Sequence, residues 1–161
     1  MNIFLSNENS IIESVKCLDN KRLNKSCVEV YQLLTSAIKE INGEQIHGYK
    51  NHPVYVFFKS NPNFLAWYGL MACKEYEFRF SKTHSIYSFF YSHCINNNKE
   101  MKQPPFIPYY MSGSINTADC IRTTQNVSNL FRQKLTLKWN ADKDKKRNPT
   151  WTNREIPSWY L

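Results

Sequence analysis

One acidic side chain follows a short basic cluster near the start of the chain. Lys21, Arg22 and Lys25 lie close together, and Glu29 comes four residues after Lys25. Cations beside a carboxylate favour its ionised form, which is the form that acts as a general base. The same cations could hold the phosphates of a nucleic acid. The alternative is an exposed ion pair between Lys25 and Glu29, which would contribute only about 0.3 kcal/mol.

A helix is needed to position these side chains. At about 100° per residue, the apolar residues of this stretch fall in one stripe and the charged residues on the opposite face. The stripe contains Leu23, Cys27, Val30, Leu34, Ala37, Ile38 and Ile41. We predict helix over residues 11–41, with a break near Asp19 and Asn20, and Glu29 on its polar face.

Two further helices are predicted downstream. Pro53 and the pair Asn61-Pro62 are typical of helix starts, and the large apolar groups of "NFLAWYGLMACKEYEFRF" predict a central, buried helix. Residues 115–137 predict another helix, and the prolines of 104–114 predict irregular structure.

The composition limits the class of protein. The chain has 161 residues, of which 42% are hydrophobic, and a net charge of +8. It is therefore not disordered, and its charge favours a polyanionic partner. We expect an all-α fold, with residues 1–161 forming one compact domain of about three main helices, long irregular loops and an aromatic C-terminal segment.

Cysteine usage and hydropathy favour an intracellular protein without a membrane span. The five cysteines include no CxxC pair, so neither a zinc site nor a disulfide framework is predicted, and reduced thiols are expected. No signal peptide and no long apolar stretch is visible. His84, His93 and Cys94 also do not fit a zinc spacing, so we expect no metal.

Three features allow both a structural and a binding interpretation. His52, before Pro53, could cap a helix or contact phosphate. The basic run that ends at Arg147 could be a solvated loop or a phosphate contact. Trp151 and Trp159 could close the core or stack on an unpaired base, and stacking contributes about 1–3 kcal/mol per base.

Four blocks in this order carry a family resemblance: "CLDNKRLNKSCVE", "NHPVYVFF" with the aromatic helix after it, "SNLFRQK", and the Trp/Tyr-rich terminus. Together they resemble the pyrimidine-dimer DNA glycosylases of the endonuclease V type, over nearly the whole chain. The resemblance implies a small all-α DNA repair enzyme that uses neither a metal nor an organic cofactor. It also implies combined glycosylase and abasic-site lyase activity on double-stranded DNA, through an amine that attacks C1′ and a later β-elimination.

The resemblance also implies roles for individual residues. Glu29 matches the family's catalytic carboxylate, and Arg22 matches a basic side chain that lines the site. From the resemblance and from the charge and aromatic patterns together, the residues expected to contact DNA are Lys21, Lys25, His52, Asn129, Arg132, Lys145, Lys146, Arg147, Trp151, Trp159 and Tyr160.

The attacking amine is left open between two kinds of group. In the better-known branch of the family it is the α-amine exposed when the initiator Met is removed. Here residue 2 is Asn, which normally blocks that removal. An α-amine has a reference pKa near 8 and is roughly a tenth neutral at pH 7, whereas a lysine is under about 0.1% neutral. Met1 is therefore favoured, with Lys21 or Lys25 as the alternative.

Three rival functions stay open at this stage. The first is a glycosylase of the same fold for another damaged or modified pyrimidine. The second is a non-catalytic DNA-binding protein. The third is an RNA-binding module, which is supported only by the net charge and the aromatic content. In the enzyme hypothesis we expect a monomer.

Overall fold

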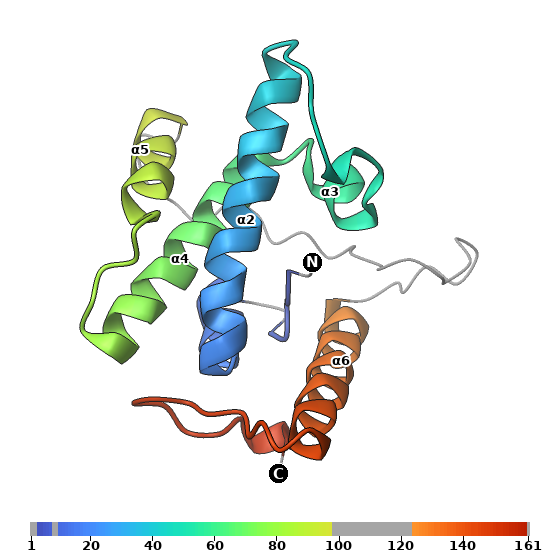
Figure 1. Ribbon diagram of the computed structural model, residues 1–161, viewed down its shortest axis with the longest axis vertical. Helices are drawn as coiled ribbons and strands as arrows, with labels where there is room; N and C mark the ends of the chain where they lie inside the picture. Colours follow the sequence, from blue (N-terminus) through green and yellow to red (C-terminus); the bar gives the residue numbers. More distant parts are fainter. Residues whose placement is uncertain (1–2, 8–9, 98–123, 161) are drawn as a thin grey trace.

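The protein is all-α over the residues that the computed structural model describes, which are 3–7, 10–97 and 124–160 (Figure 1). The three longest helices are α2 (Asn20–Ile41), α4 (Pro62–Phe80) and α6 (Thr124–Asp144). The predicted fold class is thus confirmed. None of the described helices has both the length and the apolarity needed to cross a bilayer.

The predicted break in the first helical region is present. α1 (Ile11–Lys16) starts at Ser10, whose hydroxyl accepts a hydrogen bond from the Glu13 N–H, and α2 starts after Asp19. Between the two helices, Arg79 donates hydrogen bonds to the carbonyls of Lys16 and Leu18, at 2.9 and 2.7 Å. A buried guanidinium from α4 thereby satisfies carbonyls that the break removes from the helical ladder.

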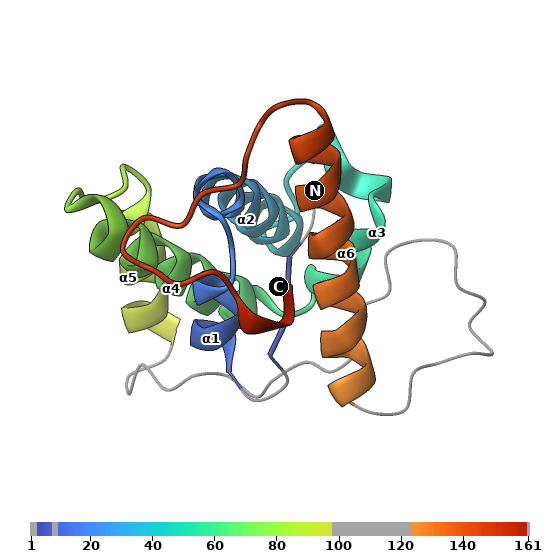
Figure 2. The same ribbon diagram turned by 90° about the horizontal axis from the view of Figure 1, so that it is seen from below.

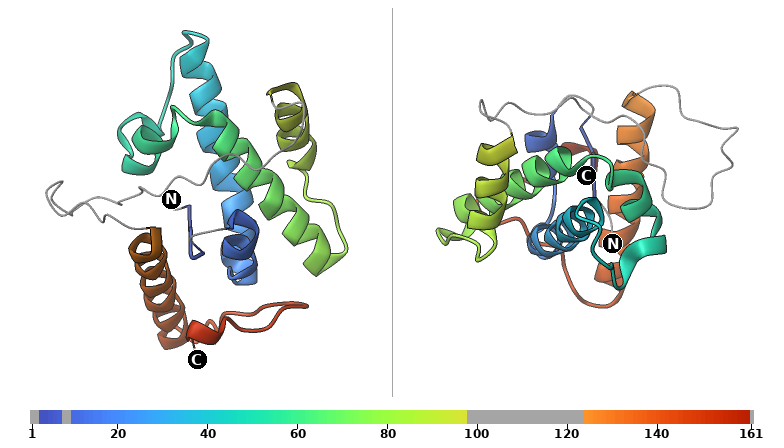
Figure 3. Two further views of the ribbon diagram at one scale, coloured as in Figure 1. Left: turned by 180° about the vertical axis from the view of Figure 1, so that it is seen from behind. Right: turned by 90° about the horizontal axis from the view of Figure 1, so that it is seen from above.

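The core is formed mainly where α2 crosses α4, which Figure 3 shows from behind and from above. The predicted apolar stripe of α2 is buried there from Leu23 to Ala37. Ile41 differs, because it is 67% exposed. The last turn of α2 projects beyond α4 (Figure 1), so α4 does not cover it. As predicted, α4 is buried on almost all sides.

Two shorter helices flank this crossing. α3 (Pro53–Phe58) follows a short 3-10 turn, η1 (Tyr49–Asn51), and begins at Pro53 as expected. α5 (Tyr87–Asn97), which was not predicted, packs on α4. The Phe90 ring lies against Gly69, where any Cβ atom would overlap it. Glycine is therefore required at this helix contact.

α6 is longer at its C-terminal end than the sequence predicted. It continues to Asp144 rather than to 137, while residues 104–123, including the predicted irregular segment and the predicted helix start, lie outside the described residues. It ends with Lys146 in the left-handed region, φ +56°. The N–H groups of Lys146 and Arg147 bond to the carbonyls of Lys143 and Asp142, which is a Schellman ending.

The C-terminal segment wraps from α6 across the ends of α2 and α4 and back, as Figure 2 shows. Thr150 accepts a hydrogen bond from the Asn20 N–H at 2.8 Å, and Arg154 pairs with Glu75 of α4 at 2.8 Å. The chain then returns in η3 (Ser158–Tyr160), which contacts α6. The tail therefore holds the three long helices together.

Candidate active site

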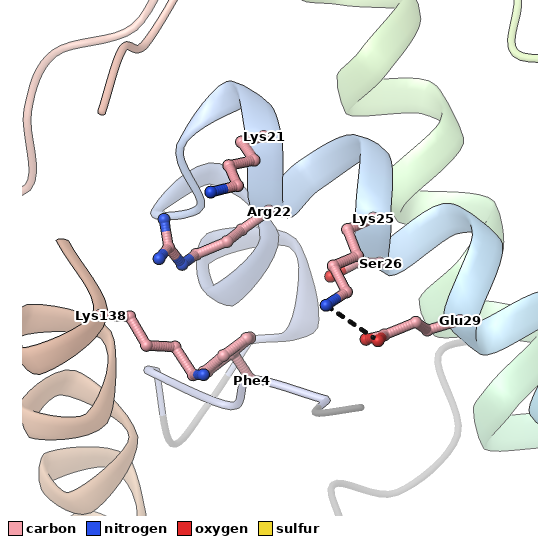
Figure 4. Close-up of a pocket in the computed structure, with 7 residues that line it drawn as sticks. All are labelled: Phe4, Lys21, Arg22, Lys25, Ser26, Glu29 and Lys138. Atoms are coloured by element: carbon pink, nitrogen blue, oxygen red, sulfur yellow. Dashed lines mark ion pairs between the residues drawn. The ribbon is translucent and has the colours of Figure 1, made fainter. Parts of the chain in front are cut away.

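A cleft lies between α2 and α6, with the N-terminal segment at its base (Figure 4). Its volume is about 230 Å³. The cleft is lined by Phe4, Lys21, Arg22, Lys25, Ser26, Glu29 and Lys138. It therefore brings together all four residues of the basic cluster and its acid, which the sequence analysis placed on one helix face.

Glu29 lies on the wall of this cleft that α2 provides. Its side chain is 14% exposed, whereas that of Lys25, one turn earlier, is 64% exposed. The lysine Nζ atom lies 3.5 Å from a carboxylate oxygen of Glu29 (Figure 4). Because the apolar stripe of α2 packs on α4, this opposite face is directed towards α6. The predicted Lys25–Glu29 contact is thus present, in a partly enclosed site.

Arg22 and Lys21 are held by carboxylates. Arg22 pairs with Asp19 at 3.0 Å and with Asp142 of α6 at 2.9 Å, and Lys21 pairs with Asp142 at 3.1 Å. Partial burial alone would raise the pKa of Asp142, but hydrogen bonds from the two cations outweigh it and hold the pKa below its ordinary value. Asp142 thereby ties α6 to α2 at one end of the cleft.

Besides Asp142, the sequence analysis missed two residues of α6 that shape this site. Trp139 is fully buried and donates a hydrogen bond from Nε1 to Asp19 Oδ1 at 2.8 Å. Its neighbour Lys138 extends into the cleft from the side opposite Glu29 (Figure 4). The sequence feature that could have revealed Lys138 is its spacing from Asp142: the two residues are four apart and so share a helix face.

His52 caps α3, which is one of its two predicted roles. Its Nδ1 atom accepts a hydrogen bond from the Val54 N–H at 3.2 Å. Burial lowers the pKa of His52, and the negative charge of Glu29 acts on it in the opposite direction. The imidazole is therefore electrostatically coupled to the cleft carboxylate, and its role towards phosphate stays a prediction.

The aromatic residues of the tail pack around Trp139. Trp159 stacks on it with ring centroids 5.4 Å apart, and Tyr160 and Trp151 meet it edge-on at 4.6 and 5.0 Å. Trp151 also donates a hydrogen bond to the Cys17 carbonyl at 3.0 Å. These contacts match the core-closing interpretation. Stacking on a base stays a prediction for all three.

The residues of the "SNLFRQK" block that are predicted to contact DNA lie outside the cleft. Asn129, Arg132 and Trp159 line a second, more open groove on α6. Arg132 donates a hydrogen bond to the Ser6 carbonyl at 2.8 Å, and its guanidinium lies 5.9 Å from the Trp159 ring centre. Lys138 is about 180° around α6 from Asn129. The predicted DNA-contacting residues thus lie on two faces of this helix.

The remaining predicted residues lie just after α6 or outside the residues that the structure describes. Lys145, Lys146 and Arg147 are exposed just after the helix, so the basic run is part helix end and part turn. Met1, the favoured amine, lies outside the described residues. The choice of Met1 over a lysine therefore stays a prediction.

The sequence model of the pyrimidine dimer DNA glycosylase family matches residues 1–88, which is more than half of the chain. The chain belongs to this family. No curated protein and no solved structure matches it significantly. The matched range includes α1 to α4, with the basic cluster and Glu29, but not α6.

Family membership and cleft geometry agree on the kind of activity. The pyrimidine dimer DNA glycosylase family makes this protein a DNA repair glycosylase. Its cleft combines one carboxylate with several cations, and cations of this kind can neutralise phosphates. The contribution of α6 to the cleft comes from the structure alone.

Proposed function

We propose that this pyrimidine dimer DNA glycosylase is also an abasic-site lyase, and that it acts on pyrimidine dimers in duplex DNA. The observation that carries the proposal is the position of Glu29. Its carboxylate lines a cleft with four cationic side chains, namely Lys21, Arg22, Lys25 and Lys138. Such an arrangement can bind the phosphates beside a damaged nucleotide and keep a proton acceptor at the sugar.

In the proposed reaction, a neutral amine attacks C1′ of the damaged nucleotide. The C1′–N bond to the base breaks, and the base leaves with its electron pair and takes up a proton, while the attacking nitrogen gives up one proton. The C1′–O4′ bond of the sugar ring then opens, O4′ takes up a proton, and a protonated imine forms between the nitrogen and C1′. Removal of a proton from C2′ then expels the 3′ phosphate by β-elimination. Water hydrolyses the imine and regenerates the amine. Glu29 carries protons in both stages.

The Met1 α-amine is the proposed nucleophile, because a larger fraction of an α-amine than of a lysine is neutral at pH 7. Among the lysines, Lys21 is bound to Asp142, whereas Lys25 lies 3.5 Å from Glu29, the proposed proton carrier, so Lys25 is the stronger alternative. Borohydride reduction during reaction with abasic DNA, followed by peptide mapping, distinguishes them. We expect the DNA adduct on Met1, and an adduct on Lys25 would overturn the assignment.

The other cations and aromatic residues are proposed to bind DNA without taking part in proton transfer. Arg22, fixed by two carboxylates, presents a rigid charge at the cleft. The exposed residues Lys145, Lys146 and Arg147 would add salt-dependent affinity. Asn129 and Arg132 would contact the duplex along the second groove. We propose that the protein acts as a monomer inside the cell, with neither a metal nor an organic cofactor in the reaction.

Nicking of UV-irradiated supercoiled plasmid in the presence of EDTA tests the function as a whole. We expect conversion to the open circular form on irradiated plasmid only. A panel of duplexes with single defined lesions then tests the substrate: cleavage of another modified pyrimidine in place of dimers would support the first rival. Binding without any cleavage would support the non-catalytic rival, and a preference for RNA would support the third.

A further inference from the structure

We propose that Cys27, Cys73 and His84 form a binding site for one thiophilic divalent cation, Zn²⁺ by its chemistry, which links α2 to α4 behind the catalytic cleft. The two sulfur atoms and one imidazole nitrogen all lie within 4.8 Å of one another. They come from α2, from α4 and from the connection between α4 and α5. Because the three residues are far apart in the sequence, no zinc spacing pattern reveals them.

The distances suit a tetrahedral zinc ion. With Zn–S bonds of about 2.3 Å and Zn–N bonds of about 2.0 Å, ligand atoms around zinc are about 3.5–3.8 Å apart. The ligand atoms here lie within 4.8 Å of one another, so they would have to move slightly closer together to bind zinc. Rotation of the side chains can provide this movement. Three protein ligands leave the fourth position for a water molecule, and partly exposed His84 lies on the side from which water can enter.

Charge balance supports a cation at this place. Cys27 and Cys73 are fully buried in the apolar α2–α4 contact, where an uncompensated charge would be very costly. Binding of a divalent cation would release two thiol protons to solvent. Two thiolates, one neutral imidazole and Zn²⁺ then have a net charge of zero. The filled site therefore adds no net charge to the core.

The surroundings of His84 hold its ring at the site. Nε2 lies 3.2 Å from Asn24 Oδ1, and Nδ1 accepts a hydrogen bond from the Ile86 N–H at 3.3 Å. The ring also meets Tyr76 edge-on at 4.9 Å. A histidine that binds metal through one nitrogen is usually held by a hydrogen bond at the other. Here the cation would bind Nδ1 in place of the Ile86 N–H, and Nε2–H would donate to Asn24 Oδ1 and so orient the ring.

The proposed site is separate from the reacting groups. Cys27 precedes Glu29 by two residues, which places the two side chains about 200° apart around α2. The cation would therefore act by fixing the crossing of α2 and α4 that carries Glu29. It adds no step to the proposed DNA chemistry, and its test uses binding and melting rather than strand cleavage.

The test is a titration of the reduced, metal-stripped full chain with Co²⁺, a coloured substitute, followed by competition with Zn²⁺. We expect one ion per chain, a thiolate charge-transfer band, the visible bands of tetrahedral cobalt, and a rise in melting temperature with Zn²⁺. His84→Gln should weaken binding at least about tenfold. Cys73→Ser should abolish the charge-transfer band or reduce it strongly.

A matched control is available on α5, where His93 and Cys94 supply the same residue types away from the group. His93→Gln and Cys94→Ser should leave stoichiometry and spectrum unchanged. His84→Gln keeps the test decisive if the buried Cys73→Ser variant does not fold, because His84 is partly exposed. Absence of stoichiometric binding, or equal loss of affinity in the control variants, would overturn the site.

Discussion

Two glutamates of this protein have the same local motif and very different surroundings. Glu75 is followed by Arg79 four residues later in α4, and Glu29 is preceded by Lys25 four residues earlier in α2. Glu75 is 6% exposed and binds Arg79 through one oxygen and Arg154 through both. Glu29 meets Lys25 at a longer distance and lines a cleft. The segments that pack on an i,i+4 ion pair thus decide whether its carboxylate is buried as a structural group or lines a cleft.

The difference arises from the C-terminal segment. This segment crosses the end of α4 and brings Arg154 to Glu75, where the guanidinium also lies over the Phe78 ring at 3.9 Å. At α2 the segment contacts Asn20 instead, and α6 stands opposite the charged face. Both carboxylates are thus partnered, but Glu29 also lines the cleft between α2 and α6.

The largest expected effect in this comparison is on activity. Glu29→Gln should lower cleavage of dimer-containing duplex by at least about 100-fold, because general acid–base catalysis typically contributes 10²- to 10⁴-fold. The melting temperature of the Glu29→Gln variant should stay close to that of the wild type. Single-turnover assays with equal amounts of folded protein measure this. Full strand cleavage by the variant would end the catalytic assignment.

The reciprocal substitution should act on stability. Glu75→Gln leaves Arg79 and Arg154 without their shared carboxylate, and breaking a buried pair of this kind costs about 3 kcal/mol. Urea denaturation measures this loss in the free energy of unfolding. The cleavage rate per folded molecule should be unchanged. A stable variant with impaired cleavage would mean that the two glutamates are not functionally distinct.

The pH dependence of stability should also separate the two sites. Burial alone would raise the pKa of Glu75, but hydrogen bonds from Arg154 and Arg79 outweigh it and lower the pKa from 4.5. A carboxyl whose pKa is lower when folded contributes stability above its unfolded pKa and loses it as the pH falls through the folded pKa. Wild-type protein should therefore lose stability below about pH 4.5, and Glu75→Gln should lose less over the same range. Thermal melts between pH 3 and 6 test this, and parallel curves would contradict it.

The smallest expected effects concern the cationic partners. Lys25→Gln should change the free energy of unfolding by under about 0.5 kcal/mol. If Lys25 contacts a phosphate, the slope of log binding constant against log salt should become less steep by about 0.9. Arg154→Gln should instead lower stability by about 1–2 kcal/mol and leave the salt slope unchanged. Titration of duplex DNA at several salt concentrations compares the two, and equal slopes for Lys25→Gln and wild type would remove that contact.

Local patterns predicted much of the helical content. The apolar stripe of α2, the break before Asn20, and the starts of α3 and α4 at proline were all readable, because each depends on periodicity or on capping by neighbouring residues. α5 was missed, because "YSFFYSHC" is rich in aromatics without a clear polar face, and its contact depends on Gly69 in α4. Such a contact is invisible to a local pattern.

The candidate site was predicted in part. Glu29 and its basic neighbours lie on one face of a single helix, so helical periodicity placed them together correctly. Lys138, Trp139 and Asp142 were missed as site residues, because their importance depends on the docking of α6 against α2. Asn129 and Arg132 were grouped with the site by resemblance, yet they line another groove, since they lie on a different side of α6.

By itself, the sequence determined an all-α protein with one helix that separates an apolar stripe from a basic face bearing Glu29. Helical periodicity fixes that separation without reference to the rest of the chain. Only the tertiary structure decided which carboxylate borders a cleft, which cations are tied down by Asp142, and which thiols meet a histidine. Those outcomes depend on contacts between segments far apart in the chain, such as Arg22 with Asp142, 120 residues away, which no local pattern encodes.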